Sequence, residues 1–382
     1  MTGTQATGEA PSGSRRSVAI DVIRTTAMVL VVAMHTSDRT CYETPVLYGI
    51  VKAAGALGVP FFVMMTGYLM VGRTYDDEYL DRFLRNNLLP LVVALEAWNL
   101  LWYLLGKLPF YSNDPITLDN TLRVATFTGD SHNAFWYVPL VVGLYLGMPI
   151  FSAAAKWVDA HWNHAYAKVL VGALLYFGSV VPTVHAILAG GLGIDWQLTS
   201  VYRMNIFGNA VWGGSVWAIY LAVGFAIRGG HLRRVRTGAL VVAGVACFVM
   251  LAVYIPVSSW RDMADSAGYD YSFLPTVVAA ACIFELTLRG EGRLRRMGER
   301  VQALVREGAA VSFGVYMTHL FVWGAVWGFL KLSGLIAFAK SHVLVLIPVY
   351  VATVAVVTAV SWAIVRLVGR IPWCRRWLLL MK

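Results

Sequence analysis

Charged side chains are scarce in this chain of 382 residues: Asp, Glu, Lys and Arg make up only 14%, while 58% of the residues are hydrophobic. Soluble domains carry about a quarter charged residues. The composition therefore excludes an ordinary soluble protein and predicts a polytopic membrane protein. The net charge of +10 would suggest a nucleic-acid partner in a soluble protein. Here it is expected to mark the loops on one side of the bilayer, with no nucleic acid involved.

Several functional signatures are also missing. The four cysteines (Cys41, Cys247, Cys282 and Cys374) lack metal-ligand spacing, and two of them lie in predicted spans. Neither a metal site nor a disulfide framework is therefore expected. There is no Walker sequence, no GxSxG motif and no internal repeat. These absences exclude a nucleotide-binding, hydrolase or solenoid unit and leave a single membrane domain.

Apolar stretches near the length of about 20 residues that a membrane helix needs predict an all-α fold of about ten transmembrane helices. They cover residues 17–36, 46–71, 84–105, 136–155, 168–188, 210–228, 238–257, 272–289, 309–330 and 342–368.

The placement of Lys and Arg orients these helices. Of the 31 basic residues, 22 lie in one alternating set of connections and termini, 7 lie in the other set, and 2 (Arg24 and Lys52) lie within spans. The positive-inside rule then predicts that both termini are cytoplasmic. Residues 1–16, rich in Gly, Ser and Thr, are expected to be a disordered cytoplasmic tail. Residues 17–368 form the membrane domain, and residues 369–382 form a basic cytoplasmic tail.

The first span carries Asp21, Arg24 and His35. Eleven residues separate Arg24 from His35, which places them on nearly the same helix face, about 16.5 Å apart along the axis. Asp21, three residues before Arg24, is close enough to pair with it. Charged groups inside a span usually face a cavity or a partner, so these are functional candidates. The alternative is a surface ion pair, with His35 at the far end in headgroup water.

Further polar residues have two interpretations each. Arg82 and Arg85, three residues apart, suit a phosphate-bearing ligand or simply anchor a cytoplasmic loop. Glu96, inside the third span, could hold His35 in one tautomer, line an acceptor cavity, or be a structural carboxyl. Trp136 and Tyr137 fit an aromatic belt or a sugar-stacking surface.

His319 lies inside the ninth span, with Tyr316 three residues before it on the same face. A single intramembrane histidine is more often structural than functional, so this residue alone decides nothing.

Taken together and in order, these fragments resemble the integral-membrane acyltransferase 3 family over about residues 17 to 368, including its ten-helix count. The likeness is closest to stand-alone surface-polysaccharide O-acetyltransferases of the enterobacterial common antigen type. One difference is that relatives often have a His shortly before the Trp-aromatic pair, where this chain has Ala134 and the nearest His is His132. The residues that carry the resemblance are Arg24 and His35; Gly58 to Phe62 with Gly67 and Tyr68; Arg82 and Arg85; Phe135 to Tyr137 with Tyr145 and Pro149; and Ser312 to Tyr316 with His319.

The resemblance implies a multi-pass enzyme of the bacterial plasma membrane that moves an acyl group from cytosolic acyl-CoA, usually acetyl-CoA, to a hydroxyl of a surface or lipid-linked glycan. It carries the Arg-x10-His motif onto Arg24 and His35, and the Arg-x-x-Arg motif onto Arg82 and Arg85. His35, Arg24 and Glu96 are then the expected catalytic residues. Arg24, Arg82 and Arg85 are expected to bind the acyl-CoA, and Trp136, Tyr137 and His319 the acceptor.

Three questions stay open at the level of sequence. His35 either accepts the proton of the attacking hydroxyl or forms a covalent acyl intermediate. The acceptor is a glycan or a small secondary metabolite. The rival from another class is a glycan or lipid transporter, which predicts inverted repeats and discontinuous helices.

Overall fold

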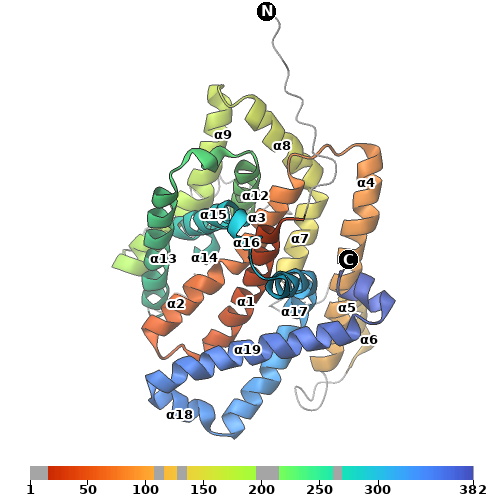
Figure 1. Cartoon of the computed structure of the whole chain (residues 1–382), viewed down its shortest axis with the longest axis vertical. Coiled ribbons are helices and arrows are strands. Elements are labelled where there is room, and N and C mark those ends of the chain that lie inside the picture. Colours follow the sequence, from red (N-terminus) through yellow and green to blue (C-terminus); the bar gives the residue numbers. More distant parts are fainter. Residues whose placement is uncertain (1–15, 107–115, 127–135, 195–214, 261–268, 382) are drawn as a thin grey trace, which may run out of the picture.

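The computed structural model describes residues 16–106, 116–126, 136–194, 215–260 and 269–381, and every regular element within these ranges is a helix (Figure 1). The elements are α1 (Val18–Thr40), α2 (Pro45–Ala56), α3 (Gly58–Met70), α4 (Asp77–Phe83), η1 (Leu84–Leu88), α5 (Leu89–Gly106), α6 (Leu118–Ala125), α7 (Tyr137–Leu146), α8 (Met148–Ala160), α9 (Ala165–Leu175), η3 (Tyr176–Val180), α10 (Val181–Ala186), η4 (Ile187–Leu192), α12 (Ser215–Arg228), η5 (His231–Arg234), α13 (Thr237–Trp260), α14 (Tyr269–Ser272), α15 (Leu274–Arg289), α16 (Glu291–Leu294), α17 (Glu299–Leu332), α18 (Leu335–Ser341), α19 (Val343–Val368) and η7 (Cys374–Leu378).

The prediction of an all-helical polytopic membrane protein is confirmed. In the described part of the chain, seven helical segments are long and apolar enough to cross a membrane. An eighth candidate is the pair α7 and α8, which is bent by 64° at Gly147. The count is thus seven to eight rather than ten. The other two predicted ranges, 210–228 and 272–289, correspond to shorter helices, the apolar segment Val216–Arg228 and the 16-residue α15.

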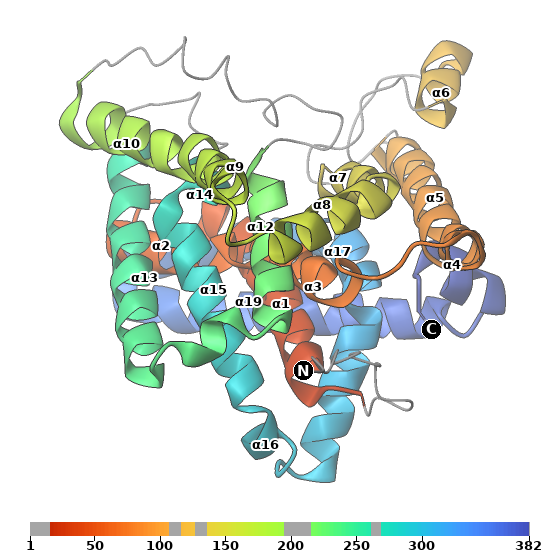
Figure 2. The same ribbon diagram turned by 90° about the horizontal axis from the view of Figure 1, so that it is seen from above.

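Helix α1 lies in the interior of the bundle, packed against α2, α3, α17 and α19. Both views show it there, with α13 and α5 at opposite edges (Figures 1 and 2). Two glycines allow neighbouring helices to approach it closely. A Cβ at Gly58 of α3 would lie 2.9 Å from Val31 Cγ2, and one at Gly308 of α17 would lie 2.7 Å from Thr25 Cγ2. Small residues at helix contacts permit such close packing in membranes.

The basic connections predicted to share one side of the membrane do gather at one end of the bundle. Side chains from five of these connections contact segments that are distant in sequence. These contacts are Lys156 Nζ to Thr74 Oγ1 (3.2 Å), Arg228 to the Tyr68 carbonyl (3.3 Å), Arg289 to the Leu232 carbonyl (2.7 Å), Arg295 to the Arg16 carbonyl (3.2 Å) and Arg366 to Glu307 (2.8 Å).

A separate set of contacts joins the connection after α1 to α2 and α18 at the opposite end. Lys340 pairs with Glu43 at 2.7 Å, and Lys52 pairs with Asp38 at 2.8 Å. Among the described residues, one end of the bundle is therefore strongly basic and the other carries fewer charges. The side of the membrane that each faces stays a prediction.

Candidate functional site

Two imidazoles meet inside the bundle. The ring of His35, near the end of α1, lies with its centroid 5.2 Å from that of His319 in the middle of α17. His319 is almost completely buried, with 1% of its surface exposed. The fold therefore places side by side two residues that are 284 positions apart in the sequence. From the sequence alone, each could only be considered separately.

The tautomer of neutral His319 follows from its backbone contact. Its Nδ1 lies 2.6 Å from the carbonyl oxygen of Tyr316, one turn earlier in α17. A carbonyl oxygen can only accept a hydrogen bond, so Nδ1 carries the proton. In the neutral ring, Nε2 is then the acceptor nitrogen, the form in which an imidazole can accept a proton or a hydroxyl hydrogen bond.

Arg24 is not paired with Asp21, which corrects the ion pair expected within α1. The Asp21 carboxylate instead binds Arg16, with Arg16 Nε at 2.7 Å and Nη2 at 2.9 Å. Among the described residues, no carboxylate lies within ion-pair distance of Arg24. Its guanidinium interacts electrostatically with Tyr137 and Tyr145 on α7. Arg24 therefore keeps its positive charge available inside the bundle.

A row of aromatic rings connects the histidine pair to the predicted acceptor residues. Tyr316 lies 5.9 Å from His319, and Tyr137 lies 5.7 Å from Tyr316, measured between ring centroids. Trp136 follows Tyr137 at 6.2 Å and has 38% of its surface exposed. The row thus runs from the buried His319 to an exposed indole, so Trp136, Tyr137 and His319 belong to one continuous arrangement.

Two further aromatic residues extend this row and were missed from the sequence. Trp217 of α12 and Tyr271 of α14 lie 5.6 Å and 5.5 Å from Trp136, and 5.2 Å from each other. Trp217 is one of 14 tryptophans, and nothing in its spacing distinguishes it. Only the packing of α7, α12 and α14 identifies the three-ring cluster of Trp136, Trp217 and Tyr271.

Arg82 and Arg85 lie at the basic end, on α4 and on the π-helical turn η1, and both are exposed. Arg82 is 3.5 Å from Glu78 and stands over the Tyr79 ring at 5.9 Å. Between them, Phe83 is buried, and its ring lies 5.4 Å from that of Tyr145. Phe83, on the segment that carries the two exposed arginines, therefore packs against a tyrosine that is within electrostatic range of Arg24.

No hydrogen bond joins Glu96 to either histidine of the pair. Both of its carboxylate oxygens are buried without a hydrogen-bond partner in the structure. Trp98, two residues later on α5, faces the C-terminal segment, where its Nε1 donates to the Leu378 carbonyl at 2.8 Å. Trp102, one turn further, donates to the Met317 carbonyl of α17 at 3.2 Å. Glu96 therefore lies on a different face of α5 from the two tryptophans.

The position of α1 is fixed at its first turn by a carboxylate from the far part of the chain. Glu291 accepts hydrogen bonds from Ser17 Oγ (3.0 Å), Val18 N (3.1 Å) and Ala19 N (2.6 Å), and pairs with Arg295 at 2.6 Å. Burial raises the pKa of the Glu291 carboxyl, but the three hydrogen bonds and Arg295 outweigh it. The pKa therefore lies below its ordinary value. A negative group at this position also interacts favourably with the positive, N-terminal end of the α1 helix dipole.

Some predicted features fall outside the described residues, namely residues 1–15 of the predicted tail, and His132, Ala134 and Phe135 before Trp136. Within the described ranges, no group of three or more His, Cys, Asp or Glu side chains is arranged to hold a metal ion.

The fold is that of a helical, multi-pass membrane protein with an Arg and a His along one interior helix. Comparison of the sequence with known families then identifies the family. A family profile described as an acyltransferase domain matches residues 17–366. The chain therefore belongs to the acyltransferase 3 family and is a multi-pass membrane protein.

One curated relative is an amino-acid racemase of Enterococcus faecalis, 23% identical over 291 residues, which cover 75% of this chain and 37% of that protein. The chain thus spans little more than a third of this relative's length. No solved structure matches the chain.

Proposed function

We propose that the protein is a membrane O-acyltransferase that moves an acetyl group from cytosolic acetyl-CoA to a hydroxyl of a cell-surface or lipid-linked glycan. In this it would be like the enterobacterial common antigen acetyltransferase type. The observation that carries the proposal is the His35–His319 pair, whose ring centroids lie 5.2 Å apart. His35 shares the interior helix α1 with Arg24, and no described carboxylate lies within ion-pair distance of Arg24.

The donor is proposed to enter from the basic end. Arg82 and Arg85 are exposed there and suit the phosphates of the nucleotide part of acetyl-CoA. Arg24 is the next cation towards the interior, about three helical turns before His35. The long pantetheine arm matches this separation between a phosphate-binding end and a reacting end. The basic end is proposed to be cytoplasmic, because Lys and Arg concentrate on that side of membrane proteins.

The acceptor is proposed to bind along the aromatic row. Aromatic faces pack against sugar rings, and Trp136 is the exposed ring of its cluster. Trp217 and Tyr271 pack against it, with centroids 5.2 to 5.6 Å from one another, and hold its indole in place. Tyr137 continues the row towards the site. His319 is proposed to hold the acceptor beside His35, with Nε2 accepting a hydrogen bond from a hydroxyl next to the one that reacts. Glu96 is proposed to line the acceptor cavity, since no hydrogen bond connects it with His35.

The proposed reaction balances as a single acyl transfer. The acceptor oxygen attacks the thioester carbonyl carbon, and His35 takes the hydroxyl proton as general base. The carbon–sulfur bond then breaks, and the departing thiolate of CoA receives the proton from His35. In the competing scheme, His35 itself attacks the thioester and carries the acetyl group to the hydroxyl in a second step.

The experiment that tests the function uses membranes incubated with labelled acetyl-CoA, following the label into lipid-linked or surface glycan. His35→Ala is expected to abolish labelling while the protein still inserts and folds. His342→Ala, which changes an exposed histidine outside the site, is the matched control and keeps activity. Near wild-type labelling by His35→Ala would remove His35 from the mechanism.

The same experiment separates the rival functions. Label that depends on His35 but appears in a small soluble metabolite identifies the second acceptor class. A chain that transfers no label to any acceptor, yet moves a glycan or lipid across proteoliposomes, is a transporter.

A further inference from the structure

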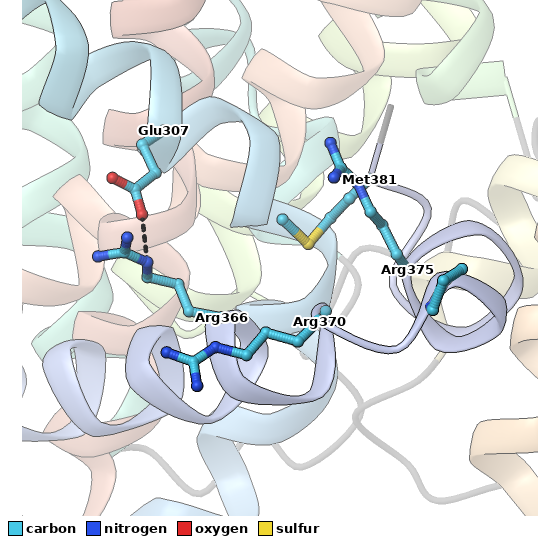
Figure 3. Close-up of a pocket in the computed structure, with 7 residues that line it drawn as sticks. Glu307, Arg366, Arg370, Arg375 and Met381 are labelled. Carbon is cyan, nitrogen blue, oxygen red and sulfur yellow. Dashed lines mark ion pairs between the residues drawn. The ribbon is translucent and has the colours of Figure 1, made fainter.

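A basic cavity lies at the end of the last membrane helix, away from the histidine pair. It has a volume of about 370 Å³ and is open to the surface. Three segments form it: α17, the C-terminal end of α19, and the chain that follows α19 through η7 (Figure 3). Its lining residues are Glu307, Arg366, Gly369, Arg370, Pro372, Arg375 and Met381.

The C-terminal chain is held in place as the wall of this cavity. The Trp98 indole of α5 donates to the Leu378 carbonyl at 2.8 Å. At Leu380 the backbone enters the left-handed region with φ 52°. The chain then turns back, and the Met381 amide bonds to the Arg375 carbonyl at 2.8 Å. The Met381 sulfur comes so close to Gly369 that a Cβ there would lie 3.2 Å from it.

The charge inside the cavity is unbalanced. Its lining contains three arginines and one carboxylate. Glu307 is already engaged, because it pairs with Arg366 at 2.8 Å and accepts a hydrogen bond from Trp362 Nε1 at 3.1 Å. Arg370 therefore adds a positive charge that the Glu307 carboxylate, already paired with Arg366, does not neutralise. Guanidinium groups bind phosphate oxygens through paired hydrogen bonds.

Apolar side chains flank these arginines on the same segment. Leu367, Ile371 and Trp373 have 62%, 55% and 56% of their surfaces exposed. In a chain that spans the membrane, a segment that alternates exposed apolar residues with arginines at a helix end is placed at headgroup level. A cavity at this depth is open to lipid phosphates.

We propose that this cavity binds a phosphate group and that its natural occupant is the headgroup of an anionic membrane lipid. The volume exceeds that of a single phosphate ion and leaves room for a substituted phosphodiester. The inference concerns lipid binding and stands apart from the acyl transfer proposed above.

The test uses the full-length protein in detergent, titrated with phosphatidylglycerol and, in parallel, with phosphatidylcholine, while native mass spectrometry counts bound lipids. Arg370→Gln is expected to weaken phosphatidylglycerol binding about fivefold, the size expected for one basic side chain near an anionic headgroup. Arg234→Gln is the matched control. It removes the same charge from an exposed position at the same end of the molecule but outside the cavity.

A third variant distinguishes binding from a structural role. Glu307→Gln removes the negative charge from the cavity while its amide oxygen can still accept the Trp362 hydrogen bond. It is expected to tighten phosphatidylglycerol binding, opposite in sign to Arg370→Gln. The proposed lipid site is wrong if Glu307→Gln and Arg370→Gln both weaken binding. It is also wrong if Arg370→Gln and Arg234→Gln have equal effects.

A parallel titration with inorganic phosphate identifies the source of the phosphate group. If phosphatidylglycerol binding depends on Arg370 and inorganic phosphate does not compete with it, the result supports a lipid headgroup as the natural occupant. An Arg370-dependent effect of free phosphate without any preference for phosphatidylglycerol over phosphatidylcholine overturns the lipid occupant and leaves a soluble anion site.

Discussion

At the scale of single residues, His319 has two roles that one substitution can separate. Its Nδ1–H bonds to the Tyr316 carbonyl, and its Nε2 is proposed to accept a hydrogen bond from an acceptor hydroxyl next to the one that reacts. His319→Asn can keep a donor near the position of Nδ1 but has no group at the position of Nε2. We expect it to lower kcat/KM for the acceptor about tenfold, the equivalent of one hydrogen bond.

The acyl-transfer assay with varied acceptor concentration measures this effect, and His319→Ala serves as the comparison. If the hydrogen bond to Tyr316 were the whole contribution of His319, the Asn variant would retain wild-type kcat/KM while the Ala variant lost it.

The Asp21–Arg24 pair shows where residue-level reading of the sequence fails. A spacing of three allows the pair, yet Arg16, just before the helix, takes both oxygens of Asp21. A residue outside the regular helix has no predictable direction, so it does not enter a periodicity argument. The spacing of Arg24 and His35, by contrast, is a property of one regular helix and could be read directly.

At the scale of helices, α3 and α12 approach closely through a reciprocal pair of glycines. A Cβ at Gly67 would meet the Leu221 carbonyl oxygen, and one at Gly224 would meet the Met64 carbonyl oxygen. Both obstacles are backbone atoms, which cannot move without shifting a helix. We therefore expect Gly67→Ala to destabilise the protein by about 1–3 kcal/mol, as overpacking does.

Thermal unfolding in detergent measures this destabilisation. Gly172→Ala in α9 is the matched control, since a Cβ there has nothing within 4 Å. An unfolding temperature for Gly67→Ala as high as that of Gly172→Ala would contradict the close approach of α3 and α12.

The first turn of α1 provides a pH-dependent prediction. The pKa of Glu291 is lowered in the folded protein, so its stabilising contribution is fully present above the ordinary pKa near 4.5 and is lost as the pH falls through the lower, folded value. Glu291→Gln is expected to cost about 0.5–2 kcal/mol at pH 7, the range for a helix N-cap.

Unfolding curves of wild type and Glu291→Gln, recorded from pH 7 downwards, should converge only below pH 4.5. Asp81→Asn, which neutralises an exposed carboxylate on α4, controls for the general loss of a charge. A difference between wild type and Glu291→Gln that stays constant with pH would show that the carboxylate charge contributes nothing.

At the scale of the whole molecule, charge separates the two ends of the bundle. We predict that the basic end faces the cytoplasm. Arg234→Cys and Ser341→Cys place exposed thiols on η5 at the basic end and at the end of α18, the opposite end. In intact cells, a membrane-impermeant maleimide should label Ser341→Cys directly and Arg234→Cys only after permeabilisation. The unmodified chain, with its four native cysteines, sets the background, and the reverse pattern would invert the topology.

The architecture was largely predictable because each membrane helix is encoded by a continuous stretch of the sequence. A run of apolar residues needs no distant partner to be recognised, and ranges such as 17–36 and 342–368 correspond closely to α1 and α19. The bend at Gly147 and the shortness of α15 were not predictable, since hydrophobicity does not specify direction. The site was only half predictable, because the meeting of His35, His319 and the Trp136 cluster is decided by which helices pack together.

Glu291 and His319 both reach α1 from late in the chain. A ribosome completes the first helix long before it adds either residue, since proteins are synthesised from the amino terminus. During that interval the first amides of α1 lack the carboxylate that caps them, and His35 has no neighbouring imidazole. The newly made segment consequently enters the bilayer without either contact, and the proposed site is complete only after residue 319 of the 382 has been added.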